Sequence, residues 1–245
     1  MQLLEVKNLA EVDSDHLPAT LARDGAVLIR QGSVGEVEAL LSRWTEPVSH
    51  PHQSAEGLTV ITPRSRSEDI ETEAGFTCAA LHPHTDRSLQ AHPPSVLAAL
   101  MVAPARSGGA AALVDGARVL ALLRHTFDDA AIAGVRLVPA DGSAGRPVIE
   151  MAEGLARFRY RDDQVAAPHG GAGSADVLAE LRRLISGTAI SLSLAAGEGY
   201  LVHNHRLLHG RAAFAGSRRL VRFLARVNPD HPYAWLNRGF SVANS

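Results

Sequence analysis

Residues 199–227 read GYLVHNHRLLHGRAAFAGSRRLVRFLARV, and the last eight of these residues have the alternating pattern of a β-strand. Residues 220–227 are predicted to form a β-strand, in which successive side chains point to opposite sides. One side of this strand is apolar and holds Val221, Phe223, Ala225 and Val227. The other side holds Arg222, Leu224 and Arg226. We therefore expect one face to pack in a core and the other to carry two guanidinium groups.

Short strands bounded by Gly, Pro and Asp recur along the chain, which indicates a mainly β fold. They are predicted at residues 25–30, 58–62, 96–102, 111–114, 135–138, 155–160, 189–194 and 200–203. Helical spacing of apolar residues predicts helices at 34–44, 117–126 and 175–186. Many short strands with few helices favour an antiparallel sandwich or jelly roll with helices on one side. Because no shift in composition marks a boundary, we expect residues 1–245 to form a single domain.

The overall composition is that of an ordinary globular protein. Of the 245 residues, 46% are hydrophobic and 20% are charged, and the formal net charge is -2, which excludes a disordered or coiled-coil chain and favours no nucleic-acid partner. The single cysteine, Cys78, cannot form an internal disulfide, and the first residues lack a secretory signal pattern. The longest apolar run, residues 96–105, is about half of the roughly 20 residues that a membrane helix needs. We expect a cytoplasmic protein with no membrane partner.

A long polar segment with several Pro and Gly residues separates the early elements from the later strands. It runs from residue 47 to residue 78 and contains the acidic run 68–73, interrupted only by the short strand predicted at 58–62. Loops longer than about 12 residues inside compact domains are often lids or binding loops. We therefore expect residues 63–78 to form a lid over a site.

Two clusters among the 12 histidines suggest a metal site. In the first, residues 81–87 read LHPHTDR, and on a strand His84 and Asp86 would project to the same face. The second, residues 203–211, reads HNHRLLHGR and can supply a third ligand, His209. Two histidines and one carboxylate can occupy one face of an octahedral metal, as in non-haem Fe(II) oxygenases.

The remaining histidines of these clusters are rival ligands: His82, His203 and His205. His205 and His209 are four residues apart, a spacing that on a helix would point both toward one zinc ion. The strand predicted before them and Gly210 after them make a helix unfavourable there. We interpret the three rivals as supporting or surface residues.

An arginine clamp is the second expected feature of the site. Arg222 follows His209 by 13 residues, where a dicarboxylate bound at the metal would need a salt bridge, and Arg forks suit bidentate binding of carboxylates. Arg218 and Arg219 are alternatives, but Gly216 and Ser217 before them predict a turn, and we expect both to be solvated loop residues.

Several motifs in fixed order resemble the Fe(II)/2-oxoglutarate dioxygenases of the taurine dioxygenase and clavaminate synthase group. The resemblance covers residues 80–228 and rests on His84-Thr85-Asp86, Pro93-Pro94, Gly108-Gly109, Asp115, Asn204, His209-Gly210-Arg211 and the closing 222–228 segment RFLARVN. It implies a double-stranded β-helix (jelly roll, cupin-like) that uses O2, with iron held by His84, Asp86 and His209. It also implies that Arg222 binds the distal carboxylate of 2-oxoglutarate and that Arg226 lies nearer the substrate carboxylate or the keto-acid end.

The sequence departs from the pattern of this group at two positions. One is the metal carboxylate, which is often Glu in the branch that acts on amino acids and is Asp86 here, as in the taurine branch. Members often have Thr two residues after the Gly-Gly pair to help hold 2-oxoglutarate, whereas this chain has Ala111, so that contact must be absent or replaced. Related halogenases have a small residue in place of the metal carboxylate, and Asp86 therefore argues against halogenation.

The resemblance also indicates which class of substrate to expect. The closing motif most resembles the branch that hydroxylates free amino acids, so we expect hydroxylation of an unactivated carbon of a small amino acid or an amino-acid-derived metabolite. In that branch, acidic residues before the second histidine ligand recognise a basic side chain, a role that Asp162 or Asp163 would take here. One alternative is oxidation of a sulfonate or other small organic acid gripped by Arg226. Another is a barrel that binds a metal or a small acid without catalysis.

Overall fold

The computed structural model describes residues 4–6, 9, 16–48, 58–64, 74–171 and 173–242. Its largest sheet has the strand order β1-β2-β15-β6-β18-β3, with β4 pairing to β18, and only the β1–β2 pair is parallel. The strands are β1 (Leu4–Val6), β2 (Ala26–Ile29), β3 (Thr45–Pro47), β4 (Thr59–Ile61), β6 (Val96–Ala103), β15 (Gly199–His203) and β18 (Arg219–Val227). The alternating sequence of β18 therefore forms a central strand, as its apolar face predicts.

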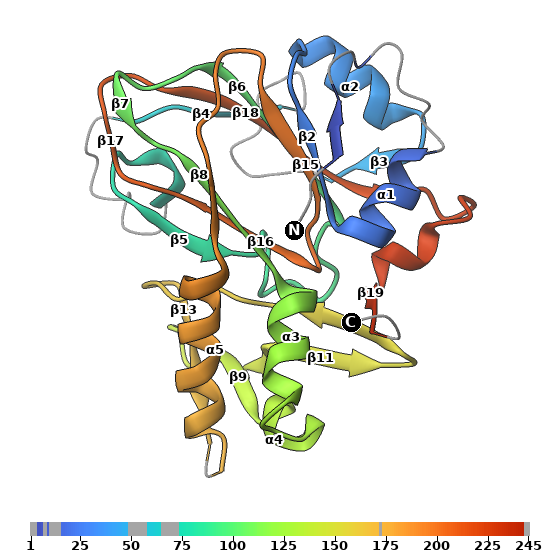
Figure 1. The fold of residues 1–245 in the computed structure, drawn as a ribbon, viewed down its shortest axis with the longest axis vertical. Coiled ribbons are helices and arrows are strands. Elements are labelled where there is room, and N and C mark those ends of the chain that lie inside the picture. Colours follow the sequence, from blue (N-terminus) through green and yellow to red (C-terminus); the bar gives the residue numbers. More distant parts are fainter. Residues whose placement is uncertain are drawn as a thin grey trace.

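A second, smaller sheet faces the first (Figure 1). Its order is β14-β8-β16-β5, formed by β5 (Leu81–His84), β8 (Ala111–Asp115), β14 (Ile190–Leu192) and β16 (Leu207–Arg211), and the ribbon of β7 (Ser107–Gly108) and β17 (Phe214–Ala215) extends beside it. Leu97 and Ala99 from β6 pack in one buried cluster with Leu113 from β8 and Leu207 from β16. The two sheets thus enclose a common core, which confirms the predicted mainly β, double-stranded β-helix fold.

Two helices cover the outer face of the large sheet, α1 (His16–Asp24) and α2 (Val34–Ser42). Their apolar residues, including Leu21 and Leu40, pack with Val27, Ala98 and Val221 of the sheet. Helix α2 begins at a capping box in which Ser33 and Glu36 satisfy each other's backbone amides. The short η4 turn (Ala234–Asn237) packs on the same side through the buried Leu236.

A third group of elements lies at one end of the sheets (Figure 1). It has helices α3 (Gly116–Arg124), α4 (Asp129–Ala133) and α5 (Ala175–Thr188), and strands β9 (Val135–Pro139), β10 (Arg146–Pro147), β11 (Ile149–Ala152), β12 (Leu155–Phe158), β13 (Ala166–Gly170) and β19 (Phe240–Ser241). The strands form two three-stranded sheets, β10-β9-β13 and β11-β12-β19. These elements share a separate buried cluster that includes Leu120, Leu137, Phe158 and Leu181.

Most predicted elements are confirmed, and β5 was considered only as a condition for His84 and Asp86 to share a face. The sequence analysis missed two helices and several strands: α1, α4, β1, β3, β7, β10, β11, β13, β16, β17 and β19. The sequences of β10 (RP) and β13 (AAPHG) contain proline and no β-branched or large apolar residue, so they lack the pattern that predicts strands. Of the predicted lid, residues 65–73 lie outside the described residues, and the described part contains η3 (Ala74–Phe76). The lid and the single domain stay predictions. In the described part of the chain, no helix is both long and apolar enough to span a membrane.

Candidate active site

Strand pairing brings the two predicted histidine ligands together. In the antiparallel β16–β5 pair, His209 lies directly opposite His84, so that both side chains project to the same face. Their ring centroids are 4.5 Å apart. The sequence explains this only in part, because the partner of each strand depends on contacts between segments 125 residues apart.

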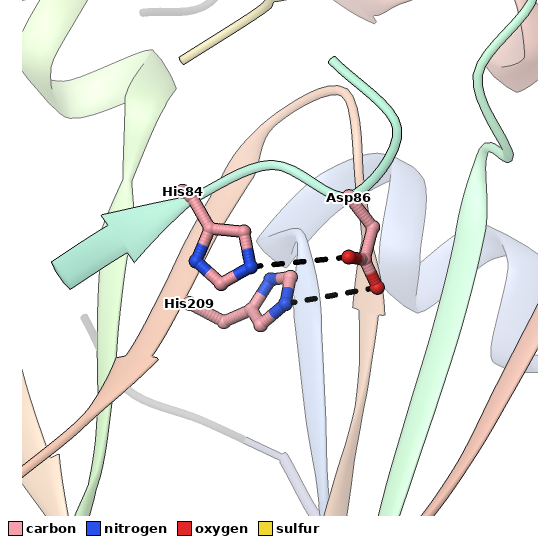
Figure 2. Close-up of side chains that lie close together, drawn as sticks. All are labelled: His84, Asp86 and His209. Atoms are coloured by element: carbon pink, nitrogen blue, oxygen red, sulfur yellow. Dashed lines mark ion pairs between the residues drawn. The ribbon is translucent and has the colours of Figure 1, made fainter. Parts of the chain in front are cut away.

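Asp86 completes the cluster from the segment that follows β5 (Figure 2). Its carboxylate oxygens lie 3.8 Å from His84 Nε2 and 3.9 Å from His209 Nε2. One ligand atom from each of the three residues lies within 4.8 Å of the others. The structure therefore brings together the three residues that the sequence analysis selected as metal ligands.

The protonation states of the two histidines suit a metal. Burial lowers the pKa of His209 to about 3 and lowers the pKa of His84 as well, so both rings are neutral, which is the form that binds a metal. The carbonyl oxygen of His82 can only accept a hydrogen bond, so His84 donates to it from Nδ1 (3.0 Å), which leaves Nε2 for a metal. Two neutral imidazoles and a carboxylate form the donor set that non-haem Fe(II) prefers.

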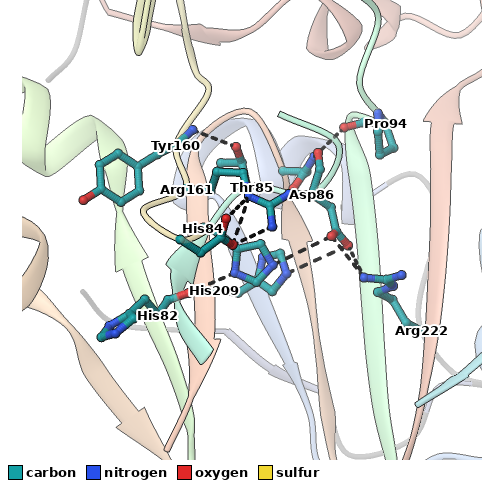
Figure 3. Close-up of polar contacts among 11 residues, drawn as sticks. His82, His84, Thr85, Asp86, Pro94, Tyr160, Arg161, His209 and Arg222 are labelled. Atoms are coloured by element: carbon teal, nitrogen blue, oxygen red, sulfur yellow. Dashed lines mark hydrogen bonds and ion pairs between the residues drawn. The ribbon is translucent and has the colours of Figure 1, made fainter. Parts of the chain in front are cut away.

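Asn204 holds the backbone of Asp86 in place. Its Oδ1 accepts from the Asp86 amide (2.8 Å), and its Nδ2 donates to the carbonyl oxygens of Asp86 (3.0 Å) and Pro94 (2.8 Å). On the other side of the segment, Thr85 exchanges hydrogen bonds with the backbone of Tyr160 (Figure 3). Asn204 is fully buried. Such supporting contacts orient metal ligands.

Replacing Asn204 with alanine is expected to weaken iron binding by roughly 10- to 100-fold, because the Asp86 backbone loses its anchor. The measurement is the Fe(II) dissociation constant of the folded protein. Asn237→Ala is the matched control, since Asn237 bridges the backbone of Val227 in the same manner but does not contact Asp86. An equal loss of iron affinity in both variants would show that Asn204 acts only on stability.

The three residues open into a cavity of about 280 Å³ between the two sheets. Apolar side chains such as Leu97, Ala99 and Ala111 form part of its wall, and Ala111 is where the resembling group often has Thr. The charged lining residues are mostly basic: Arg87, Arg161, Arg211, Arg218 and Arg222. Asp86 is the one carboxylate among the described lining residues. The charge of the lining therefore favours the binding of anionic ligands in this cavity.

Arg222 reaches this cavity but contacts the metal site directly. Its Nη1 lies 3.0 Å from Oδ1 and 2.9 Å from Oδ2 of Asp86 (Figure 3). The sequence analysis expected it to bind the distal carboxylate of a keto acid. In the structure, its charge is balanced by the carboxylate of the ligand cluster.

Arg218 is not the solvated residue that the sequence analysis expected. It is only 5% exposed, it lines the cavity, and its guanidinium lies over the ring of Phe214 at 5.7 Å. The prediction was wrong because the inward face of β18 continues one residue before the strand begins, and Arg218 shares the parity of Arg222. Counting back by four from Arg222 would have found it. Arg219, on the opposite face, is exposed as expected.

The Arg218 guanidinium has no hydrogen-bond acceptor among the residues that the structure describes, and its Nε is buried without a partner. Burial lowers the pKa of Arg218, which shows that its charge is poorly solvated. A buried unpaired charge is costly, so an anionic ligand is its natural complement.

Other predicted site residues lie outside the lining of the cavity. Arg226 shares the face of Arg222 but donates to the carbonyl oxygen of His92. Asp162 pairs with Arg182 (2.9 Å), and Asp163 pairs with Arg161 (2.9 Å). The residue of this segment that lines the cavity is Arg161, which the sequence analysis did not select.

The rival histidines have structural roles. The buried His203 and His205 each place Nε2 near a backbone carbonyl oxygen of η4, that of Leu236 (2.9 Å) and that of Asn237 (3.2 Å). Neither lines the cavity, and the His82 side chain is exposed. Arg211 donates to the carbonyl oxygens of Gly75, Thr77 and Ala79, which ties the end of the predicted lid to β16.

A double-stranded β-helix in which a His-x-Asp pair and a distant His converge beside buried arginines defines the class of Fe(II)- and 2-oxoglutarate-dependent oxygenases. The model of one family, described as taurine catabolism dioxygenase TauD, TfdA family, matches residues 1–224, and the chain belongs to this family. It is therefore an oxidoreductase that uses Fe(II) and 2-oxoglutarate.

Solved structures share the fold at low sequence identity. An asparagine oxygenase, in complex with Fe(II), 2S,3S-3-hydroxyasparagine and succinate, is 18% identical, with a TM-score of 0.65 over 86% of this chain and 78% of that chain. PvcB from Pseudomonas aeruginosa is 17% identical (TM-score 0.68, 91% of this chain, 83% of that chain). The oxygenase OrfP, in complex with Fe, succinate and (3S)-hydroxy-L-Arg, is 13% identical (TM-score 0.62, 88% and 82%). No curated protein sequence matches this chain significantly.

Proposed function

We propose that this oxygenase hydroxylates an unactivated carbon of a small amino acid or an amino-acid-derived metabolite. The observation that carries the proposal is the convergence of His84, Asp86 and His209 at the wall of a cavity that also contains the buried Arg218, which has no hydrogen-bond acceptor among the described residues. Asparagine oxygenase and OrfP, which have the same fold, are complexed with hydroxylated amino acids, and this likeness of fold supports the substrate class.

His84, Asp86 and His209 are proposed to hold the iron. Bound Fe(II) supplies the chemistry in which O2 and 2-oxoglutarate give succinate and CO2 and one oxygen atom enters the substrate. Three protein ligands leave other positions at the metal for ligands that are not protein. Asn204 holds the Asp86 ligand in its orientation. The partly apolar wall of the cavity keeps water from the reacting carbon.

Arg218 is proposed to bind the distal carboxylate of 2-oxoglutarate. The deep burial of its guanidinium and the lack of a described acceptor support this role, and Phe214 fixes one side of it. Tyr200 also lines the cavity, and burial raises the pKa of its phenol to about 12, so the hydroxyl stays protonated and can donate a hydrogen bond. Arg222 then remains beside Asp86 at the metal end. Arg226, which donates to the carbonyl oxygen of His92 and is not among the described lining residues, is proposed to take no part in this site.

The test of the proposed function is a visible spectrum followed by a substrate screen. Anaerobic addition of Fe(II) and 2-oxoglutarate is expected to produce a charge-transfer band, and in air one or more amino acids should stimulate the formation of succinate. The control omits 2-oxoglutarate. A protein that binds no iron and shows no band would contradict the proposal and would favour a barrel without catalytic activity.

The cavity gives specific support to one second candidate, the oxidation of a sulfonate or other small organic acid. Its charged lining is mostly arginine, and Asp86 is the one carboxylate among the described lining residues. Stimulation of succinate formation by taurine or a simple carboxylic acid, but not by amino acids, would favour this candidate.

A further inference from the structure

The acidic residues near the cavity are already committed to arginines. Asp163 accepts from Arg161 Nε at 2.9 Å and 3.0 Å, and also from the backbone amides of Val165 (2.8 Å) and Ala166 (3.3 Å). Asp162 is paired with Arg182 on helix α5, at 2.9 Å and 3.3 Å. Neither carboxylate lines the cavity. Neither is therefore placed to receive a basic group of a substrate.

Arg161 itself faces the cavity beside His84 and Thr85 (Figure 3). Asp163 holds the edge of the guanidinium formed by Nε and Nη2. Nη1 has no hydrogen-bond partner among the described residues. The second edge, formed by Nη1 and Nη2, is thus available in a fixed orientation, and such an edge suits the two oxygens of a carboxylate or sulfonate.

The four other basic lining residues have other interactions or roles. Arg211 is bound to backbone carbonyls, and Arg218 is assigned to 2-oxoglutarate. Arg222 is bound to Asp86, and Arg87 interacts with the charge of the same carboxylate. Asp86, the one carboxylate of the described lining, belongs to the metal site. A cationic side chain of a substrate would meet arginines in this cavity, which is unfavourable at short distance.

We propose that Arg161, positioned by Asp163, binds an anionic group of the substrate and makes the enzyme selective for acidic over neutral and basic substrates. This inference rests on the proposed function and deepens it. It replaces the expectation that Asp162 or Asp163 recognises a basic side chain. Arg161 determines specificity by direct contact, whereas Asp163 acts through Arg161.

The test uses pairs of compounds that differ in charge but not in size. L-aspartate is compared with L-asparagine, L-glutamate with L-glutamine, and L-arginine serves as the basic probe. Each is titrated into the anaerobic Fe(II)- and 2-oxoglutarate-loaded protein, and binding is followed by calorimetry and by the change in the visible band. At least one acid is expected to bind 10-fold or more tightly than its amide, a difference of about 1.4 kcal/mol, because the acid gains a charge-assisted hydrogen bond.

Variants test whether the Arg161 side chain causes this preference for the acid. Arg161→Gln should abolish the preference for the acid while the band and the affinity for 2-oxoglutarate persist. Arg161→Lys, which keeps the charge but lacks the planar guanidinium, should retain part of the preference for the acid. Asp163→Asn should weaken the binding of the acid without changing the binding of the amide. Arg182→Gln is the matched control, because it removes a similar ion pair whose arginine does not line the cavity.

The outcomes separate this inference from the proposed function. A protein that forms no band with Fe(II) and 2-oxoglutarate contradicts the proposed function. A protein that forms the band but binds the amides or L-arginine as tightly as the acids, or binds none of the acids, overturns the role of Arg161 alone. So does an Arg161→Gln variant that keeps the preference.

Discussion

The His209→Ala variant is expected to lose succinate formation by more than about 100-fold, which is the upper end of the loss caused by removing a residue that only supports a ligand. His209 lies opposite His84 in the strand pair and provides one of three converging ligand atoms, so the remaining two residues can no longer occupy one face of a metal. The measurements are the rate of succinate formation at saturating 2-oxoglutarate and the iron content after gel filtration.

The His169→Ala variant is the control for this prediction, because His169 is exposed on β13 and does not line the cavity. It should retain both iron and activity. If His209→Ala kept the iron content and the activity of the unmodified protein, the assignment of His209 as a ligand would be wrong.

The Arg218→Gln variant is expected to raise the KM for 2-oxoglutarate by roughly 10- to 100-fold, because a buried charge-assisted contact to the distal carboxylate is lost. The Arg219→Gln variant is the matched control, since it makes the same change one residue later on the exposed face. Steady-state kinetics with varied 2-oxoglutarate measure the effect.

A stability measurement separates binding from a structural role for Arg218. Because its buried charge has no described acceptor, its replacement should not lower the free energy of unfolding without 2-oxoglutarate. A structural arginine would instead destabilise the protein when it is lost. If Arg222→Gln raised the KM for 2-oxoglutarate and Arg218→Gln did not, the distal carboxylate would belong to Arg222, as the sequence analysis expected.

Much of the fold could be predicted from local patterns. Alternating apolar residues in 220–227 predict β18, and the turn-bounded runs predict most strands of both sheets. The strands β10 and β13 could not be predicted in this manner, because they contain proline and no β-branched or large apolar residue and are held by pairing with β9. Their partner, and not their own sequence, selects the extended conformation.

The candidate metal site could also be predicted from the sequence. His84 and Asp86 are two residues apart, which on a strand would place them on one face, and the ordered motifs single out His209 among several histidines. In the structure β5 ends at His84, and Asp86 lies in the segment that follows it. The structure brings the three together, and it places His203 and His205 at backbone carbonyls, away from the cavity.

The sequence by itself therefore determined the strand pattern of the fold, the family resemblance and the three residues that meet at the candidate metal centre, because short spacing and alternation express them. Only the tertiary structure decided the partners of the charged residues: Arg218 buried and without a described acceptor, Arg222 on Asp86, and Asp163 on Arg161. The physical reason is that an ion pair depends on which segments meet in space and on how deeply they are buried, and local sequence encodes neither.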